Sequence, residues 1–113
     1  MNREMKLKGT GILGLLLCMA FGVFALPAQG QGGGEALYKS KCAGCHGPDG
    51  KGQTAVGKAD NIRDLGSAEV QAQSDDAIAG IIGNGKGKMP AYGKSLKPDQ
   101  IKDLVAYIRT LKK

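Results

Sequence analysis

The sequence predicts an all-α fold of three to five short helices joined by long loops. One observation is an apolar stripe at helical spacing near the C-terminus, made of Ile101, Leu104, Val105, Ile108 and Leu111. A second is that no segment alternates between apolar and polar residues for long enough to predict a sheet. A third is the content of 19 Gly, which gather between residues 44 and 57 and between 83 and 93, a pattern typical of loops.

The length of 113 residues allows a single domain. Apolar residues make up 42% of the chain, but aromatic residues only 4%, and there is no Trp. Without the N-terminal segment described next, about 85 residues remain, near the lower limit for a self-sufficient core. Chains of this size usually need disulfides, a metal or a bound cofactor, and three Cys exclude a disulfide-dense scaffold. The composition therefore favours a cofactor.

Residues 1–28 are predicted to be a secretory signal peptide, cleaved between residues 25 and 30. Three cations precede the uncharged residues 9–26, and small residues follow. The alternative is an uncleaved membrane anchor, for which this stretch with four Gly is barely long enough. Cys18 lies inside this apolar stretch, where we expect it to serve only as a small apolar side chain. We therefore expect an exported protein, in the periplasm or an equivalent extracytoplasmic space.

The charge balance excludes one class of partner. The formal charge of +6 falls to about +4 without the signal, because Arg3, Lys6 and Lys8 are opposed there only by Glu4. No basic helix face with interleaved aromatic residues is present, so nucleic-acid binding is not expected. The excess cations gather at Lys86, Lys88, Lys94 and Lys97. They either keep the surface solvated or steer the protein toward an acidic partner.

The first half of the mature chain is predicted to contain one helix. Residues 29–34 have the composition of a Gly-rich linker with nothing to bury. Residues 35–45 suit a short helix with Leu37 and Tyr38 on its apolar face. Residues 44–57 are dense in Gly and other turn residues and predict a loop.

The second half is predicted to contain at least two helices. Residues 58–73 fit no single element, and their expected buried points are Ile62, Leu65 and Val70. Ser74 suits a helix N-cap with two Asp after it, and the Gly-Asn-Gly at residues 83–85 ends that helix. Its apolar positions are Ala77, Ile78, Ile81 and Ile82. Pro98 suits the first turn of the last helix, which carries the C-terminal stripe.

The pentapeptide Cys42-Ala43-Gly44-Cys45-His46 is the motif that carries chemistry. In a C-x-x-C-H pattern, both thiols add to haem vinyl groups and the adjacent His binds the iron. Three other interpretations are weaker. A redox dithiol needs a surrounding β-α-β pattern, a zinc site needs four ligands, and a simple disulfide gives the His no purpose.

The second axial ligand is approached by elimination. The chain has one His, and of its four Met only Met89 lies outside the predicted signal. Met89 stands before Pro90 in a Gly-rich loop that could approach a flat ring closely. If haem is bound, Met89 is therefore the expected ligand. An open iron, or ligation by Lys86 or Lys88, remains as the alternative.

From residue 35 to the C-terminus, the chain resembles the small monohaem class I cytochromes c of bacteria. The resembling segments are ALYKSKCAGCHGPDGKG, SDDAIAGIIGNGKGKMPAYG and LKPDQIKDLVAYIRTL. The resemblance implies the class I cytochrome c fold for residues 35–113. It also implies one covalent haem c, thioethers at Cys42 and Cys45, and iron ligation by His46 and Met89.

The resemblance further implies how the ligand-bearing turn is held. Gly34 and Tyr38 would pack against Leu104 and Tyr107 where the first and last helices cross. The turn after the His, at residues 47 and 48, would supply a backbone carbonyl to the imidazole Nδ1. Residues 54–66 depart from the family pattern, which often has a Pro-containing loop there, so the haem contacts of this segment are not assigned.

A His/Met pair fills both axial positions and predicts electron transfer rather than an enzyme, with no small-molecule substrate at the iron. The expected function is a monomeric one-electron shuttle whose redox partner proteins present acidic docking surfaces. Two alternatives stay open. One is a haem subunit of an oxidoreductase complex. The other is a haem-based ligand sensor or peroxidase with a labile Met ligand.

Overall fold

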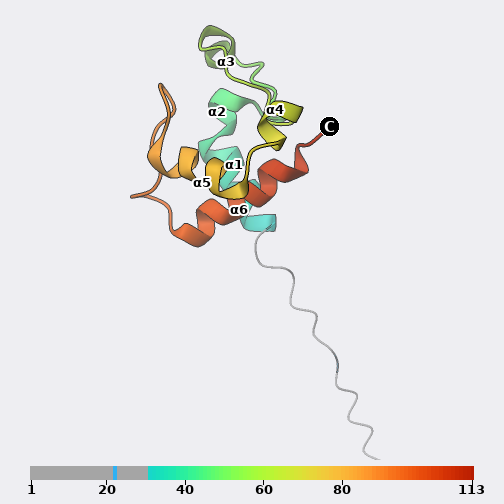
Figure 1. Cartoon of the computed structure of the whole chain (residues 1–113), viewed down its shortest axis with the longest axis vertical. Helices are drawn as coiled ribbons and strands as arrows, with labels where there is room; N and C mark the ends of the chain where they lie inside the picture. Colours follow the sequence, from blue (N-terminus) through green and yellow to red (C-terminus); the bar gives the residue numbers. More distant parts are fainter. Residues whose placement is uncertain (1–21, 23–30) are drawn as a thin grey trace, which may run out of the picture.

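The computed structural model describes residue 22 and residues 31–113 and confirms the all-α prediction. Six helical segments follow one another in Figure 1: α1 (Gln31–Lys41), α2 (Ala43–His46), α3 (Ala55–Ala59), α4 (Ala68–Gln71), α5 (Asp75–Asn84) and α6 (Pro98–Thr110). This exceeds the expected three to five because α2 and α4 are single turns of four residues each. The only β-type pairing in residues 31–113 is an isolated bridge between Lys86 and Met89.

The predicted signal peptide, residues 1–28 with Cys18, lies outside the described residues apart from Gly22. Within the part of the chain that the structure describes, no helix is long and apolar enough to cross a membrane.

Helices α1 and α6 cross each other and form the centre of the core, as the resemblance implied (Figure 1). Tyr38 of α1 is fully buried, and its ring centroid lies 5.0 Å from that of Tyr107. Leu104, 1% exposed, belongs to the same apolar cluster. A Cβ at Gly34 would clash with the carbonyl oxygen of Asp103 and lie 3.2 Å from Tyr107 Cβ. The two backbones therefore touch at Gly34.

The expected linker at residues 29–34 is wrong for its last four residues, which form the first turn of α1. Glycine is a poor helix former, so local propensity favoured a linker. Close packing of Gly34 against α6 instead extends the helix toward the N-terminus. The predicted helix at 35–45 is divided in two, since α1 ends at Lys41 and a new turn begins at Ala43.

Helix α5 begins and ends, and helix α6 begins, where the sequence predicts. The Ser74 hydroxyl accepts a 3.1 Å hydrogen bond from the backbone N–H of Ala77. Gly85, with a φ of 74°, ends α5 in a conformation that favours glycine. Pro98 lies in the first turn of α6. The buried side chains of these two helices are Ile78, Ile82, Leu104, Val105 and Ile108.

The ambiguous segment at residues 58–73 contains the end of α3 and all of α4. Thr54 and Ser67 cap these helices by accepting hydrogen bonds from backbone N–H groups at 2.8 and 3.3 Å. Of the three expected buried points, Val70 is buried, whereas Ile62 and Leu65 are half-buried. All three residues line the cavity described next.

Candidate functional site

A cavity of about 680 Å³ opens between α2, α3, α5 and the loop at residues 85–93, here called the Met89 loop. Its wall brings together all four residues singled out by the sequence: Cys42, Cys45, His46 and Met89. Apolar side chains from α1, α5 and α6 line the deeper part, and they include Tyr38, Ile78, Ile82, Leu104 and Ile108. Volumes between about 300 and 1,000 Å³ with a mostly apolar lining are typical of cofactor pockets.

The turn that carries both Cys and the His is held from outside. Cys42 is the N-cap of α2 and His46 is its last residue. Three consecutive carbonyls of this turn accept hydrogen bonds: Cys45 O from Thr54 Oγ1 at 2.6 Å, His46 O from Gly52 N at 2.7 Å, and Gly47 O from the Tyr38 hydroxyl at 2.6 Å. Because the three donors come from separate positions in the chain, together they fix the orientation of this turn.

The imidazole of His46 is not satisfied by the polypeptide. Its Nδ1 is buried and has no hydrogen-bond partner among residues 31–113. The resemblance implied a carbonyl from residue 47 or 48, but the Gly47 carbonyl accepts from Tyr38 and from Gly50 N instead. Burial lowers the pKa of His46, so the ring is neutral near pH 7. Neutral imidazole is the form that binds a metal.

The two cysteines differ in exposure but share the cavity. Both are free thiols; Cys42 is half-buried and Cys45 is exposed. Burial raises the pKa of the Cys42 thiol. In the described part of the chain, no group of three or more His, Cys, Asp or Glu side chains is arranged to hold a metal ion.

Met89 reaches the cavity from a tight turn. Its backbone N–H donates to Lys86 O at 3.0 Å, and Lys86 N donates to Met89 O at 3.2 Å. Gly87 lies inside this turn with a φ of 56°, a conformation that favours glycine. Met89 is half-buried and packs against the apolar core. The loop therefore presents its thioether to the same space as the imidazole.

The segment that the sequence left unassigned forms another wall. Val56, Ala59, Asp60, Asn61, Ile62, Arg63 and Leu65 all line the cavity. Val56 is 45% exposed and is the one large apolar side chain with high exposure among residues 31–113. Asn61 has a φ of 51°, which Asn tolerates better than most residues. The Thr54 cap was the available sequence signal for α3.

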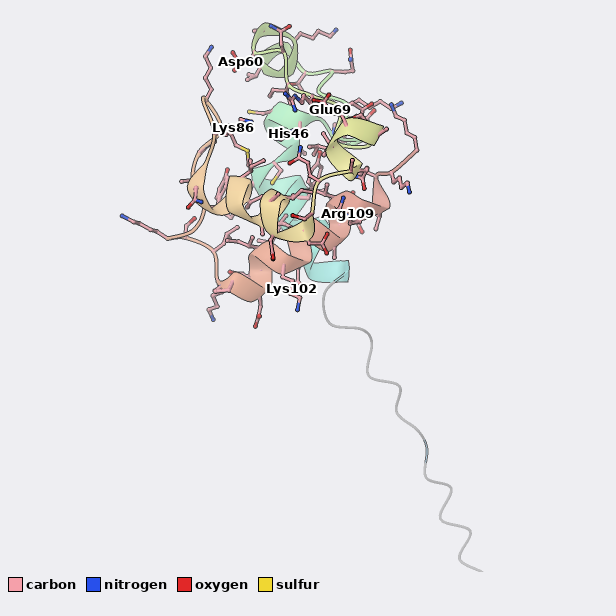
Figure 2. The ribbon with its side chains drawn as sticks, in the orientation of Figure 1. His46, Asp60, Glu69, Lys86, Lys102 and Arg109 are labelled. Atoms are coloured by element: carbon pink, nitrogen blue, oxygen red, sulfur yellow. The ribbon has the colours of Figure 1, made fainter. Side chains whose placement is uncertain are left out.

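The lysines expected to flank Met89 are not equivalent. Lys88 forms a 2.6 Å ion pair with Asp60, whereas Lys86 has no ion-pair partner among the described residues. Asp60, Lys86 and His46 lie around one end of the molecule in Figure 2, and all three line the cavity. Lys94 and Lys97 are exposed but do not line it.

The residues present fit a covalently attached haem. Two thiols and an imidazole approach the cavity from one side and a thioether from another. The interior is mostly apolar, and among the described residues the one buried side-chain N or O atom without a hydrogen-bond partner belongs to the imidazole. Thiols, imidazole and thioether are the groups that attach and bind haem iron in c-type sites.

Comparison with known proteins gives consistent matches. A family model described as cytochrome c oxidase, cbb3-type, subunit III matches residues 30–108. A cytochrome c6 of Gloeothece citriformis is 38% identical over 104 residues, which cover 91% of each protein. The CcoP subunit of the cbb3-type cytochrome c oxidase of Rubrivivax gelatinosus is 42% identical over 79 residues. Those residues are 69% of this chain and 25% of that subunit.

Solved structures match over the described helices. The KustC0563 c-type cytochrome superposes with a TM-score of 0.66 at 36% identity, covering 71% of this chain and 98% of that one. Cytochrome c6 of the diatom Phaeodactylum tricornutum superposes with a TM-score of 0.54 at 26% identity, covering 70% and 90%. The structural similarity therefore extends over almost the whole length of the two matched proteins, the KustC0563 cytochrome and the diatom cytochrome c6.

Proposed function

The chain belongs to the small monohaem class I c-type cytochromes, and from this premise we propose that Cys42 and Cys45 attach its haem c while His46 and Met89 bind the iron. Its function is electron transfer through a covalently bound haem. The observation that supports the residue assignment is that these four side chains line one cavity. No other His or Met occurs in residues 31–113.

When bound, the haem supplies one-electron Fe(III)/Fe(II) chemistry. The Met89 thioether favours ferrous iron and raises the reduction potential relative to a second imidazole. Apolar residues of α5 and α6 keep water from the interior of the cavity. Hydrogen bonds from Tyr38, Gly52 and Thr54 hold the His46 turn in place. A rigid, dry site keeps the reorganisation on electron transfer small.

With His46 and Met89 as its two ligands from the protein, the iron would have no coordination site left for a substrate, so we assign no turnover at the iron. A redox titration followed by optical spectra tests this assignment. For His/Met ligation, the titration should show a single one-electron transition. The ferric protein should show a weak charge-transfer band at about 700 nm. A ferric spectrum without that band, or rapid carbon monoxide binding by the reduced protein, would contradict it.

The partners are redox proteins, and we propose that the cation at the cavity rim favours acidic ones. Lys86 lines the cavity and has no ion-pair partner among the described residues. Rim charges mainly change association rates. The competing explanation is that the surface lysines only keep the protein soluble.

The cellular location of the protein is proposed from residues 1–28. Their charged start, apolar stretch and small-residue end are typical of a secretory signal. Export to the periplasm or an equivalent space follows from this proposal. N-terminal sequencing of the mature protein, expected to start between residues 26 and 31, tests it. A mature protein that begins at Met1 would favour the membrane anchor.

A further inference from the structure

The two walls of the cavity that face each other across its opening are joined by one ion pair. Lys88 Nζ lies 2.6 Å from Asp60 Oδ1. Asp60 is the residue that ends α3, and Lys88 directly precedes Met89. The contact therefore links the segment that follows the Cys-His turn to the residue beside the thioether.

The loop that carries Met89 is hydrogen-bonded to α5 but has few contacts with the opposite wall of the cavity. On the α5 side, Tyr92 N donates to Ile82 O and Gly93 N donates to Gly83 O, each at 2.9 Å. Three short hydrogen bonds fix consecutive carbonyls of the His46 turn. Among the described residues, only two hydrogen bonds join residues 86–92 to α1, α2 and α3. They are the Lys88–Asp60 pair and a 3.1 Å bond from the Tyr92 hydroxyl to Lys41 O. These two contacts flank Met89 on either side along the chain.

The two partners of the ion pair differ in exposure. The Asp60 side chain is 17% exposed, and its backbone N–H donates to Val56 O at 2.9 Å, which fixes the backbone of Asp60 at the end of α3. The Lys88 side chain is 81% exposed, so water competes with Asp60 for its ammonium group. Such a pair is weak and screened by salt. A weak contact at this position can act as a latch without locking the loop.

We propose that Asp60 is a positioning residue that holds the Met89 loop closed over the cavity through Lys88, and that this pair sets how often the sixth coordination position opens. The inference rests on the proposed ligation by Met89. It goes beyond that ligation because it assigns control of ligand exchange to a residue in the segment that departs from the family pattern. The frequency with which the sixth coordination position opens then depends on ionic strength.

The test measures the rate at which neutral imidazole, at about pH 8, displaces Met89 from the ferric holoprotein. Loss of the charge-transfer band reports the displacement. Asp60→Asn and Lys88→Gln are each expected to accelerate it by about two- to fivefold, the range for exposed ion pairs. The double variant is expected to be no faster than either single variant. Lys86→Gln is the matched control, because it removes a charge from the same turn without an ion pair.

Three further measurements separate a latch from a loss of fold. A charge swap, Asp60→Lys with Lys88→Glu, should slow displacement again relative to either single change. Raising the salt from about 0.01 M to 1 M shortens the screening length from about 30 to 3 Å and should accelerate wild type but not Asp60→Asn. Thermal midpoints of all variants should stay within a few degrees.

The proposed role of the Asp60–Lys88 pair is overturned if imidazole displaces Met89 from Asp60→Asn at the wild-type rate. It is also overturned if Lys86→Gln accelerates the displacement as much as Lys88→Gln does. Failure of the proposed ligation has a different signature, since Met89→Ala would then retain the charge-transfer band. A charge-transfer band that disappears in Met89→Ala, together with an unchanged rate in Asp60→Asn, rejects the latch and leaves the ligation standing.

Discussion

The hydroxyl of Tyr38 donates a 2.6 Å hydrogen bond to the carbonyl oxygen of Gly47. The bond joins the middle of α1, at its crossing with α6, to the residue that directly follows His46. Tyr38 is fully buried and also lines the cavity. Desolvation by burial raises the pKa of its hydroxyl, which therefore stays protonated as a donor. The helix crossing and the ligand-bearing turn are thus one connected structure.

Tyr38→Phe should destabilise the holoprotein by about 1–3 kcal/mol, because the Gly47 carbonyl loses a buried donor. Denaturant unfolding measures the change. Tyr107→Phe is the control, since the Tyr107 hydroxyl makes no hydrogen bond among the described residues. Both variants keep their aromatic rings, so equal losses would mean that the hydrogen bond to Gly47 O does not account for the effect.

Replacing Gly34 with Ala should destabilise the fold by about 1–3 kcal/mol, because the added Cβ clashes with Asp103 O at the helix crossing. Gly80→Ala in α5 is the matched control, since its Cβ would meet nothing within 4 Å. That change should stabilise by about 0.4–1 kcal/mol. Thermal unfolding of both variants checks the pair. Similar stability of the two would contradict the close approach at Gly34.

Both thioether bonds are expected to survive acid-acetone extraction, and the mature mass should exceed the polypeptide by one haem. Cys42→Ser or Cys45→Ser should leave a single thioether or no holoprotein, as mass spectrometry would report. Cys18→Ser, inside the predicted signal, should leave the mature holoprotein unchanged. Extraction of free haem from the wild type would refute covalent attachment.

Met89→Ala should keep the haem attached and open the sixth position. The charge-transfer band near about 700 nm should disappear, and carbon monoxide should bind the reduced protein. Lys86→Gln, in the same turn, should retain the band and resist carbon monoxide. Persistence of the band in Met89→Ala would assign the sulfur ligand elsewhere.

Lys86→Glu should slow bimolecular reduction by an acidic redox partner, and the loss should shrink as salt screens exposed charges. Lys86 is the better test than Lys88, because Lys88 is paired with Asp60. Lys112→Glu changes the net charge equally at an exposed position that does not line the cavity. Identical rates for the two variants at low salt would leave solubility as the role of these lysines.

The sequence by itself determined those helices and motifs that are encoded by residues close together in the chain. The Ser74 cap, the glycine end at Gly85 and the apolar stripe of α6 each depend on one turn or one helix face, and all three are present in the structure. The C-x-x-C-H motif is equally local. Counting His and Met residues outside the predicted signal was enough to single out Met89.

Tertiary structure alone decided the features that depend on residues far apart in the chain. Residues 31–34 are helical because Gly34 packs against α6, a contact that overrides poor helix propensity. The Gly47 carbonyl is engaged by Tyr38, so Nδ1 of His46 lacks the expected partner. Asp60 meets Lys88 across 28 residues of sequence. No periodicity encodes such a pairing, because it arises only when α3 and the Met89 loop close around the same cavity.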